Sequence, residues 1–252
     1  MNDPLPIKQI FLEGIKMPFA NHKELIRLGW PYACLMLSSS FVADETDSIV
    51  LIITYLAIFY ITGILGIVGC HRVFLLPKKV VNETLTFRWS PRETKFLFCM
   101  LAVSILAFFI SMPFLTVIFN IIDFELINGE DYQIFFEIIL TISFIPISYI
   151  ISRFSLIFPD TAVGNNRTLL WAWNISSGYS FKLFILIGVL PLTTEYMFEL
   201  IENFVDTTYI LSFIKSALWL MVMVIEICFL SLSYKWIVSK QDKSDCNPEM
   251  LT

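Results

Sequence analysis

The stretch I-V-L-I-I-T-Y-L-A-I-F-Y-I-T-G-I-L-G-I-V-G-C, residues 49–70, contains no charged residue. A helix needs about 20 residues to cross the roughly 30 Å hydrocarbon core of a bilayer, and this stretch is long enough. Over the whole chain 57% of the 252 residues are apolar, the mean hydropathy is +0.74 and 15% are charged, whereas about a quarter of the residues in soluble domains are charged. The composition predicts an all-α fold, a polytopic transmembrane helical bundle.

Six apolar stretches of this kind divide the chain into a membrane domain and two flanks. The predicted spans are Leu28–Ala43, Ile49–Cys70, Phe96–Ile122, Ile134–Ile151, Leu183–Phe198 and Tyr209–Val238. The first and fifth are short, and each is either a span or a re-entrant or interfacial element. We therefore expect a cytoplasmic amphipathic N-terminal segment over 1–27, a six-helix transmembrane domain over 28–238 and a cytoplasmic tail over 239–252.

Basic and acidic residues alternate between the segments that connect these spans. Sixteen of the 17 lysines and arginines lie in the N-terminal segment, the second-to-third and fourth-to-fifth connections, the last turn of the sixth span (Lys235) and the tail, and Lys215 is the exception. The remaining connections contain acids and no base. Because lysine and arginine stay on the cytoplasmic side, this pattern predicts that both termini lie in the cytoplasm. A false span would have shifted the alternation, which supports the two short spans.

Three local patterns predict where helices begin or lie along the membrane surface. Ser90-Pro91-Arg92-Glu93 combines an N-cap serine, a proline at the first helical position and a glutamate three residues after the cap, as at the start of a helix. Ile7–Ile15 has apolar residues at helical spacing and predicts a short interfacial helix. Asn166–Ser177, with two leucines and a tryptophan on one face, predicts another.

One region carries a resemblance to a known family. It reads R-F-S-L-I-F-P-D over 153–160 and L-L-W-A-W-N-I-S-S-G-Y-S-F-K-L-F over 169–184. This resembles the membrane domain fused to some glycerophosphodiester phosphodiesterases and related families of small bacterial inner-membrane proteins. The matching positions are Arg153, Ser155, Pro159, Trp173, Ser176, Gly178, Lys182 and Leu183. The resemblance implies the membrane architecture; in the fused enzymes a separate soluble domain performs the chemistry, so phosphodiesterase activity is not expected here.

The same region also has a physical interpretation that does not depend on the resemblance. Arg153 at the end of a span is expected to extend toward lipid phosphates, and Pro159 to stop the helix. The helix that carries Trp173 is then expected to lie flat before Gly178 lets the chain re-enter the bilayer. Structural packing of a loop and recognition of a headgroup or partner are both open.

Ionisable residues inside spans are costly, so each one is a candidate functional residue. Glu226 lies near the middle of the last span, and Glu137 and Lys215 lie near the outer ends of two spans, where they are able to pair. Glu226 is either a hydrogen-bonding residue between helices or part of a transport path. His71 and Arg72 end the second span, where a helix-end cap is favoured over a catalytic base.

Nucleotide-binding, metalloprotease and hydrolase motifs do not occur in the sequence. The five scattered cysteines are interpreted as small buried hydrophobes, and neither a cofactor nor a metal is expected. The expected partners are the lipid bilayer and another membrane protein, not nucleic acid. The favoured function is a non-enzymatic accessory or assembly factor acting through lateral contacts, and the alternative is a small transporter or lipid-handling protein with a path near Glu226.

Overall fold

The computed structural model describes residues 5–45, 48–84, 88–121, 143–204 and 209–245, and its regular elements in these ranges are helices. Four helical stretches are long and apolar enough to cross a membrane: Ile49–Leu75, Pro91–Val117, Leu169–Phe198 and Phe213–Gln241. The all-helical, membrane-protein character is therefore confirmed. Glu137 and the first half of the predicted fourth span lie outside the described residues.

Most residues in the described ranges are helical. In chain order the helices are α1 (Ile7–Ala20), α2 (His22–Glu45), α3 (Ile49–Leu75), α4 (Lys78–Thr84), α5 (Pro91–Ile121), a helical segment over 143–154, α7 (Ile157–Ala162), α8 (Leu169–Ser176), a 3-10 turn (Ser177–Tyr179), α9 (Ser180–Leu183), a π-helical stretch (Phe184–Val189), α10 (Leu190–Phe204) and α11 (Tyr209–Asp245). Two boundaries differ from the predictions. α11 continues past Val238, and helix over 169–204 starts before the predicted fifth span because the chain only tightens into a 3-10 turn at 177–179.

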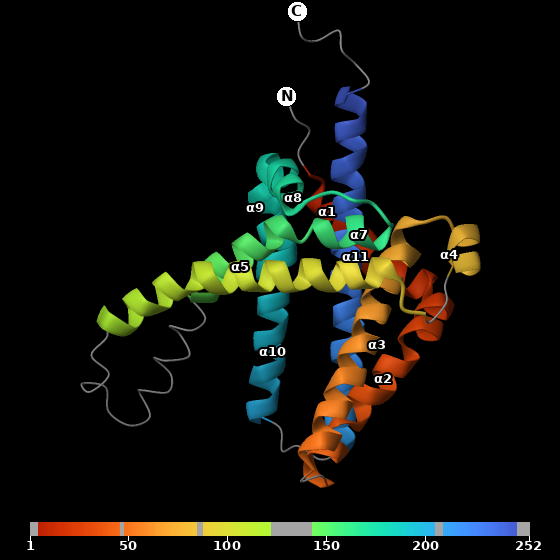
Figure 1. Cartoon of the computed structure of the whole chain (residues 1–252), viewed down its shortest axis with the longest axis vertical. Coiled ribbons are helices and arrows are strands. Elements are labelled where there is room, and N and C mark those ends of the chain that lie inside the picture. The colour runs from red at the N-terminus through yellow and green to blue at the C-terminus, as the bar shows by residue number, and fades with distance from the viewer. Residues whose placement is uncertain (1–4, 46–47, 85–87, 122–142, 205–208, 246–252) are drawn as a thin grey trace, which may run out of the picture.

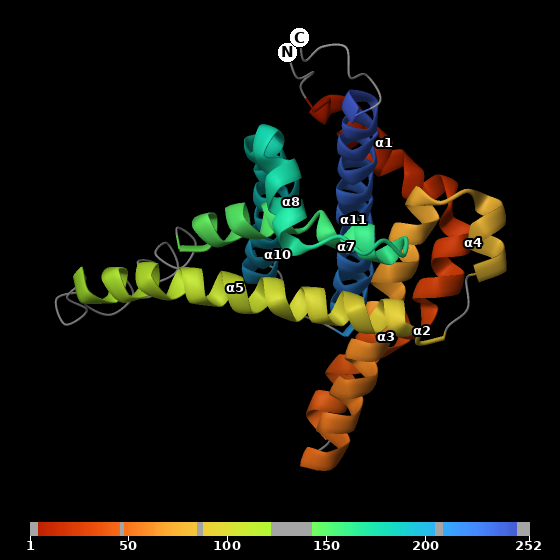
Figure 2. The same ribbon diagram turned by 45° about the horizontal axis from the view of Figure 1, so that its top comes forward.

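Most of the helices gather around α11 (Figure 1). α1, α2 and α3 pack against it, and α7 lies between α3, α5 and α11. α5 runs crosswise to α10 and α11 in both ribbon views (Figures 1 and 2). The four apolar stretches are therefore not parallel to one another, unlike the helices of a simple bundle.

Glycines on α3 set how closely α2 approaches it. A Cβ placed on Gly69 would lie 2.9 Å from Leu28, and one placed on Gly63 would lie 3.1 Å from the Tyr32 ring. These distances are too short for a larger residue without a shift of the neighbouring side chain. Small residues at such contacts are typical of packed membrane helices, because they let two helices approach closely.

The N-terminal helix α1 packs on protein along one face. Ile10, Gly14 and Pro18 are buried, and Phe11 stacks on Phe229 of α11 with 5.5 Å between the ring centroids. A Cβ on Gly14 would lie 2.2 Å from the Phe229 ring. The predicted helix is present, but its buried face lies on α11, so it is not simply an element lying along the leaflet.

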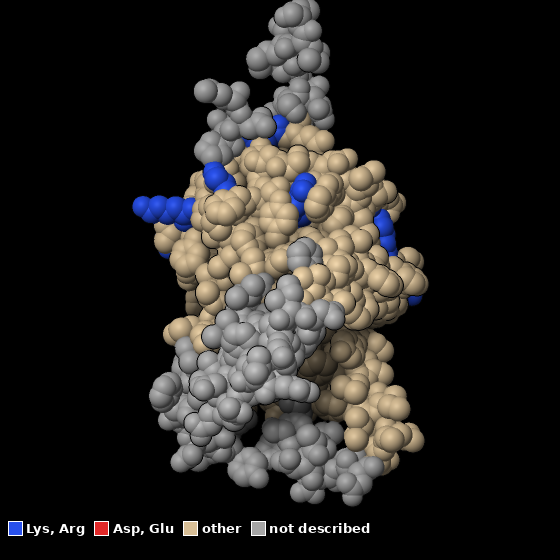
Figure 3. All heavy atoms as spheres, turned by 90° about the vertical axis from the view of Figure 1, so that its left-hand side faces the viewer, with Lys and Arg blue, Asp and Glu red and all other residues tan. Residues whose placement is uncertain are grey.

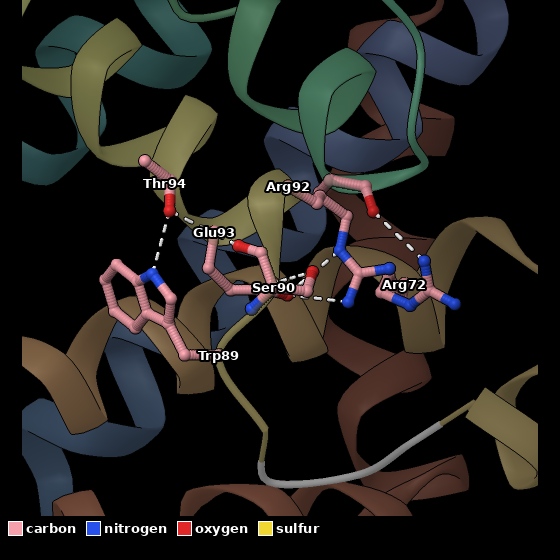
Figure 4. Close-up of polar contacts among 7 residues, drawn as sticks. Arg72, Trp89, Ser90, Arg92, Glu93 and Thr94 are labelled. Carbon is pink, nitrogen blue, oxygen red and sulfur yellow. Dashed lines mark hydrogen bonds and ion pairs between the residues drawn. The ribbon is translucent and has the colours of Figure 1, made fainter.

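The start of α5 follows the predicted capping pattern. The Ser90 backbone N–H donates to Glu93 Oε2 at 2.9 Å, and the Ser90 hydroxyl donates to the same oxygen. Arg92 donates to the other carboxylate oxygen through Nε at 2.9 Å and Nη2 at 2.6 Å, and Glu93 is buried (Figure 4). The glutamate thus satisfies an N-terminal backbone donor and joins the first turn of α5.

On one face of the molecule, the described basic residues gather toward one end (Figure 3). On the face drawn in Figure 3, Lys and Arg lie in the upper part, while the described surface below them on that face is free of both. The upper part is the end at which α1, α8 and α9 lie in Figure 1. This distribution agrees with the side of the membrane on which the sequence places most lysines and arginines.

Gly14→Ala tests the packing of α1 on α11. Alanine normally favours a helix over glycine by up to about 1 kcal/mol, but here the added methyl group meets Phe229, and such overpacking costs about 1–3 kcal/mol. We expect a lower melting temperature in mild detergent and faster proteolysis near residue 20. Gly29→Ala is the matched control, because a Cβ there meets nothing within 4 Å. Equal melting temperatures for the two variants would contradict this packing.

Candidate functional site

The most buried stretch of the described chain surrounds α7. Leu156, Ile157, Asp160 and Ala162 have no exposed surface, and Ser152, Arg153 and Ser155 are also buried. The sequence predicts a loop at the membrane surface here. The structure shows instead a short helix that inserts between α3, α5 and α11, with every residue of α7 buried except Phe158, which is partly exposed.

The end of α7 is defined by a glycine in a left-handed conformation. Gly164 has φ +96°, and its N–H donates to the Thr161 carbonyl at 3.0 Å. The Asn165 N–H then donates back to the Asp160 carbonyl at 3.1 Å. This pair of bonds is a Schellman motif, which favours glycine because a side chain is strained at positive φ. It turns Asn165 back over Asp160.

Asp160 is the centre of a hydrogen-bonded cluster that joins α7 to α11. The Tyr234 hydroxyl donates to Asp160 Oδ1 at 2.9 Å, and the Asn165 side-chain amide donates to the same oxygen at 3.0 Å. Arg167 Nε lies 3.7 Å from this oxygen, with its guanidinium over the Trp171 ring at 4.3 Å. A fully buried carboxylate requires such partners, because burying an unpaired charge costs far more than burying an apolar group.

Arg153 points into the protein, so the expectation that it extends toward lipid phosphates is wrong. Its Nε donates to the Ser176 hydroxyl at 3.1 Å and its Nη2 to the Trp173 carbonyl at 2.5 Å. The guanidinium carbon lies 3.5 Å from the centroid of the Trp173 ring. Hydrogen bonds and the aromatic face together replace water around the cation. Arg153 therefore fastens α8 to the helical segment 143–154.

Pro159 and Gly178, two further residues of the region over 153–184, lie in the first turn of a helix and in a turn between helices. Pro159 lies in the first turn of α7, where its missing N–H forfeits no hydrogen bond. The preceding helical segment ends at residue 154, ahead of the proline. Gly178 lies exposed in the 3-10 turn between α8 and α9.

A second pair of buried polar residues links α3 to its neighbours. Arg72 Nη1 donates to the Ala162 carbonyl of α7 at 3.3 Å, as Figure 4 shows beside the Arg92 and Glu93 pair. His71 Nδ1 lies 2.8 Å from Ser231 Oγ of α11. Neither residue acts as a helix-end cap, which corrects the sequence interpretation. Both side chains point toward other helices instead.

The His71 and Ser231 contact has the elements of a nucleophile and a base, but its geometry favours a structural bond. The Ser231 hydroxyl also lies 2.8 Å from the Ile227 carbonyl, to which it donates its proton, so His71 Nδ1 is the donor to Ser231. Both residues are buried, with exposed fractions of 0% and 1%. The contact is therefore a hydrogen bond between α3 and α11.

Of the charged residues singled out within spans, Glu226 and Lys215 do not share a site. Glu226 is half-buried and lines a cavity of about 60 Å³ between α10 and α11, together with Glu195 and Thr194. Lys215 lies on the same helix, about 16 Å away at 1.5 Å per residue, and does not line this cavity. Its proposed pairing with Glu137 lies outside the described residues.

Comparisons with known proteins give no relative. No family model, curated protein or solved structure matches this chain. Within the described ranges, no group of three or more His, Cys, Asp or Glu is arranged to hold a metal ion.

The hydrogen-bonded cluster around Asp160 was not predicted from the sequence. Asp160, Asn165, Arg167 and Tyr234 were not singled out, since only charges inside predicted spans were considered. One signal was present: Asp160 and Arg167 flank Gly164, and a glycine between opposite charges is compatible with a tight turn that pairs them. The contribution of Tyr234 has no local signal, because it comes from a distant helix.

Asp160→Ala tests the importance of this cluster. The substitution leaves the Tyr234 hydroxyl and the Asn165 amide without their shared acceptor, and the loss of the acceptor for the buried Tyr234 hydroxyl costs about 1–3 kcal/mol. We expect a clear loss of melting temperature in detergent and a smaller loss for Asp160→Asn, which keeps one acceptor oxygen. Glu13→Ala, at an exposed position, is the control. A melting temperature for Asp160→Ala equal to the control would refute the role of the cluster.

Proposed function

We propose that this protein is a non-enzymatic accessory or assembly factor of a bacterial inner membrane, and that it acts through lateral contacts with another membrane protein. The observation that carries the proposal is the apolar outer face of α5. The described end of this helix extends away from α3 and α11 (Figure 2). Most of its large side chains there are exposed.

The two faces of α5 differ in burial. The buried face consists of Glu93, Phe96, Val103, Ala107 and Ser111, spaced as on one side of a helix. The exposed face consists of Phe98, Leu101, Ile105, Phe108, Phe109 and Met112. An exposed apolar face of this length is either lipid-facing or a contact surface for another helix.

The base of α5 is held firmly, which favours a contact surface. Phe96 packs against Phe158 of α7 with 5.3 Å between ring centroids. Lys95 Nζ donates to the Asn165 carbonyl at 2.8 Å and to Asn166 Oδ1 at 2.9 Å. A helix fixed at its base presents its outer face at a defined position. When α5 crosses the bilayer, this outer face meets the lipid and the membrane proteins beside it.

We further propose six spans with both termini in the cytoplasm. Four candidate spans are described above, and α2 and the region over 134–151 would supply the other two. The support is the confinement of 16 of the 17 basic residues to the N-terminal segment, alternate connections, the last turn of the sixth span and the tail. The resemblance to the membrane domain of glycerophosphodiester phosphodiesterases stays a prediction.

Accessibility labelling tests this topology. Asn82→Cys, in a variant without the five native cysteines, is expected to react with a membrane-impermeant maleimide only after the inner membrane is opened. A matched Asp47→Cys variant, in the first acidic connection, is expected to react from the periplasm in intact spheroplasts. Labelling of position 82 from the periplasm would overturn the proposed orientation.

Photo-crosslinking tests the lateral contact. A photoreactive residue at Phe109, which is 67% exposed, is expected to give one reproducible protein adduct in cells. The same residue at Ile53 on α3, which is 62% exposed, is the control and is expected to crosslink to lipid. The adduct should disappear in a Phe108→Asn, Met112→Asn variant of unchanged melting temperature. Lipid adducts alone at both sites would contradict the proposal.

A transporter or lipid-handling protein is the second candidate, favoured by the cavity beside Glu226. The cavity lies next to Pro191 and the preceding π-helical stretch, and such irregular turns occur often at functional sites. Flux into proteoliposomes that Glu226→Gln abolishes would favour this candidate over the first.

A further inference from the structure

A long apolar groove lies between α2, α3 and α11, and none of the residues that bond to Asp160 lines it. Its volume is about 400 Å³, within the range of ligand pockets in proteins. Its lining runs from Pro18 and His22 at one end to Leu37 on α2, and nearly all of the lining surface is apolar. The groove therefore fits hydrocarbon rather than a polar ligand.

Two glycines keep this groove open. A Cβ on Gly66 of α3 or on Gly29 of α2 would meet no atom within 4 Å, although Gly66 itself is buried. The neighbouring Gly63 and Gly69 behave differently, because a Cβ on either would press against α2. α2 and α3 are thus tightly packed at Gly63 and Gly69, whereas space is left beside Gly29 and Gly66. The groove is therefore confined to part of this helix pair.

The length and direction of the groove suit an extended hydrocarbon chain. The distance along α2 from His22 to Leu37 is about 22 Å at 1.5 Å per residue. One leaflet of the hydrocarbon core is about 15 Å deep. The groove follows the axes of α2 and α3, the direction in which lipid chains run when these helices cross a bilayer.

Two lysines are close in sequence to the residues at the end of the groove where α1 meets α2. Pro18 and His22 line this end; the exposed Lys16 lies two residues before Pro18, and the exposed Lys23 directly follows His22. Lys23 shares a helix face with Trp30, seven residues on, which also lines the groove. Glu24 lies on the opposite side of α2 by helical spacing. The positive charge of the lysines complements a negatively charged phosphate. Exposed tryptophans such as Trp30 are common at the level of the lipid headgroups.

We propose that this groove binds one acyl chain of an anionic phospholipid, with the phosphate beside His22 and Lys23. This site is separate from the lateral contact on α5, and of its lining residues only Met223 also lines the cavity at Glu226. The acyl chain supplies the apolar contact that α2, α3 and α11 do not make with one another between Gly29 and Gly66. The bound lipid then becomes part of the packing of these three helices.

Native mass spectrometry of delipidated protein tests the proposal. The protein is mixed in mild detergent with phosphatidylglycerol or with phosphatidylcholine of the same acyl chains. The wild type is expected to retain one phosphatidylglycerol, and Gly66→Leu is expected to weaken its retention by about tenfold, because the leucine occupies the groove. Ala57→Leu adds the same bulk to an exposed position of α3 and should change nothing.

A second pair of variants separates the chain from the headgroup. Gly29→Leu, on the opposite wall, is expected to weaken retention as Gly66→Leu does, with melting temperatures of both checked against Ala57→Leu. Lys16→Gln with Lys23→Gln should lower retention of phosphatidylglycerol by about fivefold per lysine and leave phosphatidylcholine unchanged. Unchanged retention in both leucine variants, or equal retention of the two lipids by the wild type, would overturn the proposal.

Discussion

A carboxylate without any exposed surface has to be paired, and the position of Asp160 in this protein follows from that constraint. Its partners come from three places: Asn165 after the α7 turn, Arg167 beyond it, and Tyr234 on α11. The hydrogen bond from the Tyr234 hydroxyl to Asp160 holds α7 against α11. Because α3 and α5 contact α7 as well, the base of both helices is positioned by the same buried segment.

The polar contacts of the buried residues around α7 are strong because water is excluded from them. Arg72, Arg153 and Glu93 are each buried and each bonded to backbone or side-chain groups of the protein. In a medium of low polarity these bonds are costly to break, so they make one arrangement of the helices preferable to others. The apolar surfaces outside this buried region, the α5 outer face and the groove at Gly66, carry no such bonds. They are where other molecules are able to bind.

The long helices could be predicted from sequence, and the buried region around α7 could not. Residues 49–70 and the sixth stretch are apolar runs long enough to cross a bilayer, and the Ser90 to Glu93 pattern marks the start of α5 by local hydrogen bonds alone. Arg153 was misplaced because its direction depends on Trp173 and Ser176 of a later helix. Asp160 was overlooked because its main donor, Tyr234, is remote in sequence. The groove depends likewise on which glycines face a neighbour.

Hydrogen exchange of the protein in lipid nanodiscs tests most directly whether α7 is buried. The amides of Val163, Gly164 and Asn165 donate to carbonyls of residues 159–161 and close the end of α7. The account predicts that peptides covering 156–165 exchange as slowly as those covering 227–234 of α11, while the exposed connection at 166–168 exchanges fast. Exchange of 156–165 at the rate of that connection would show a surface loop and contradict the buried segment on which the helix arrangement depends.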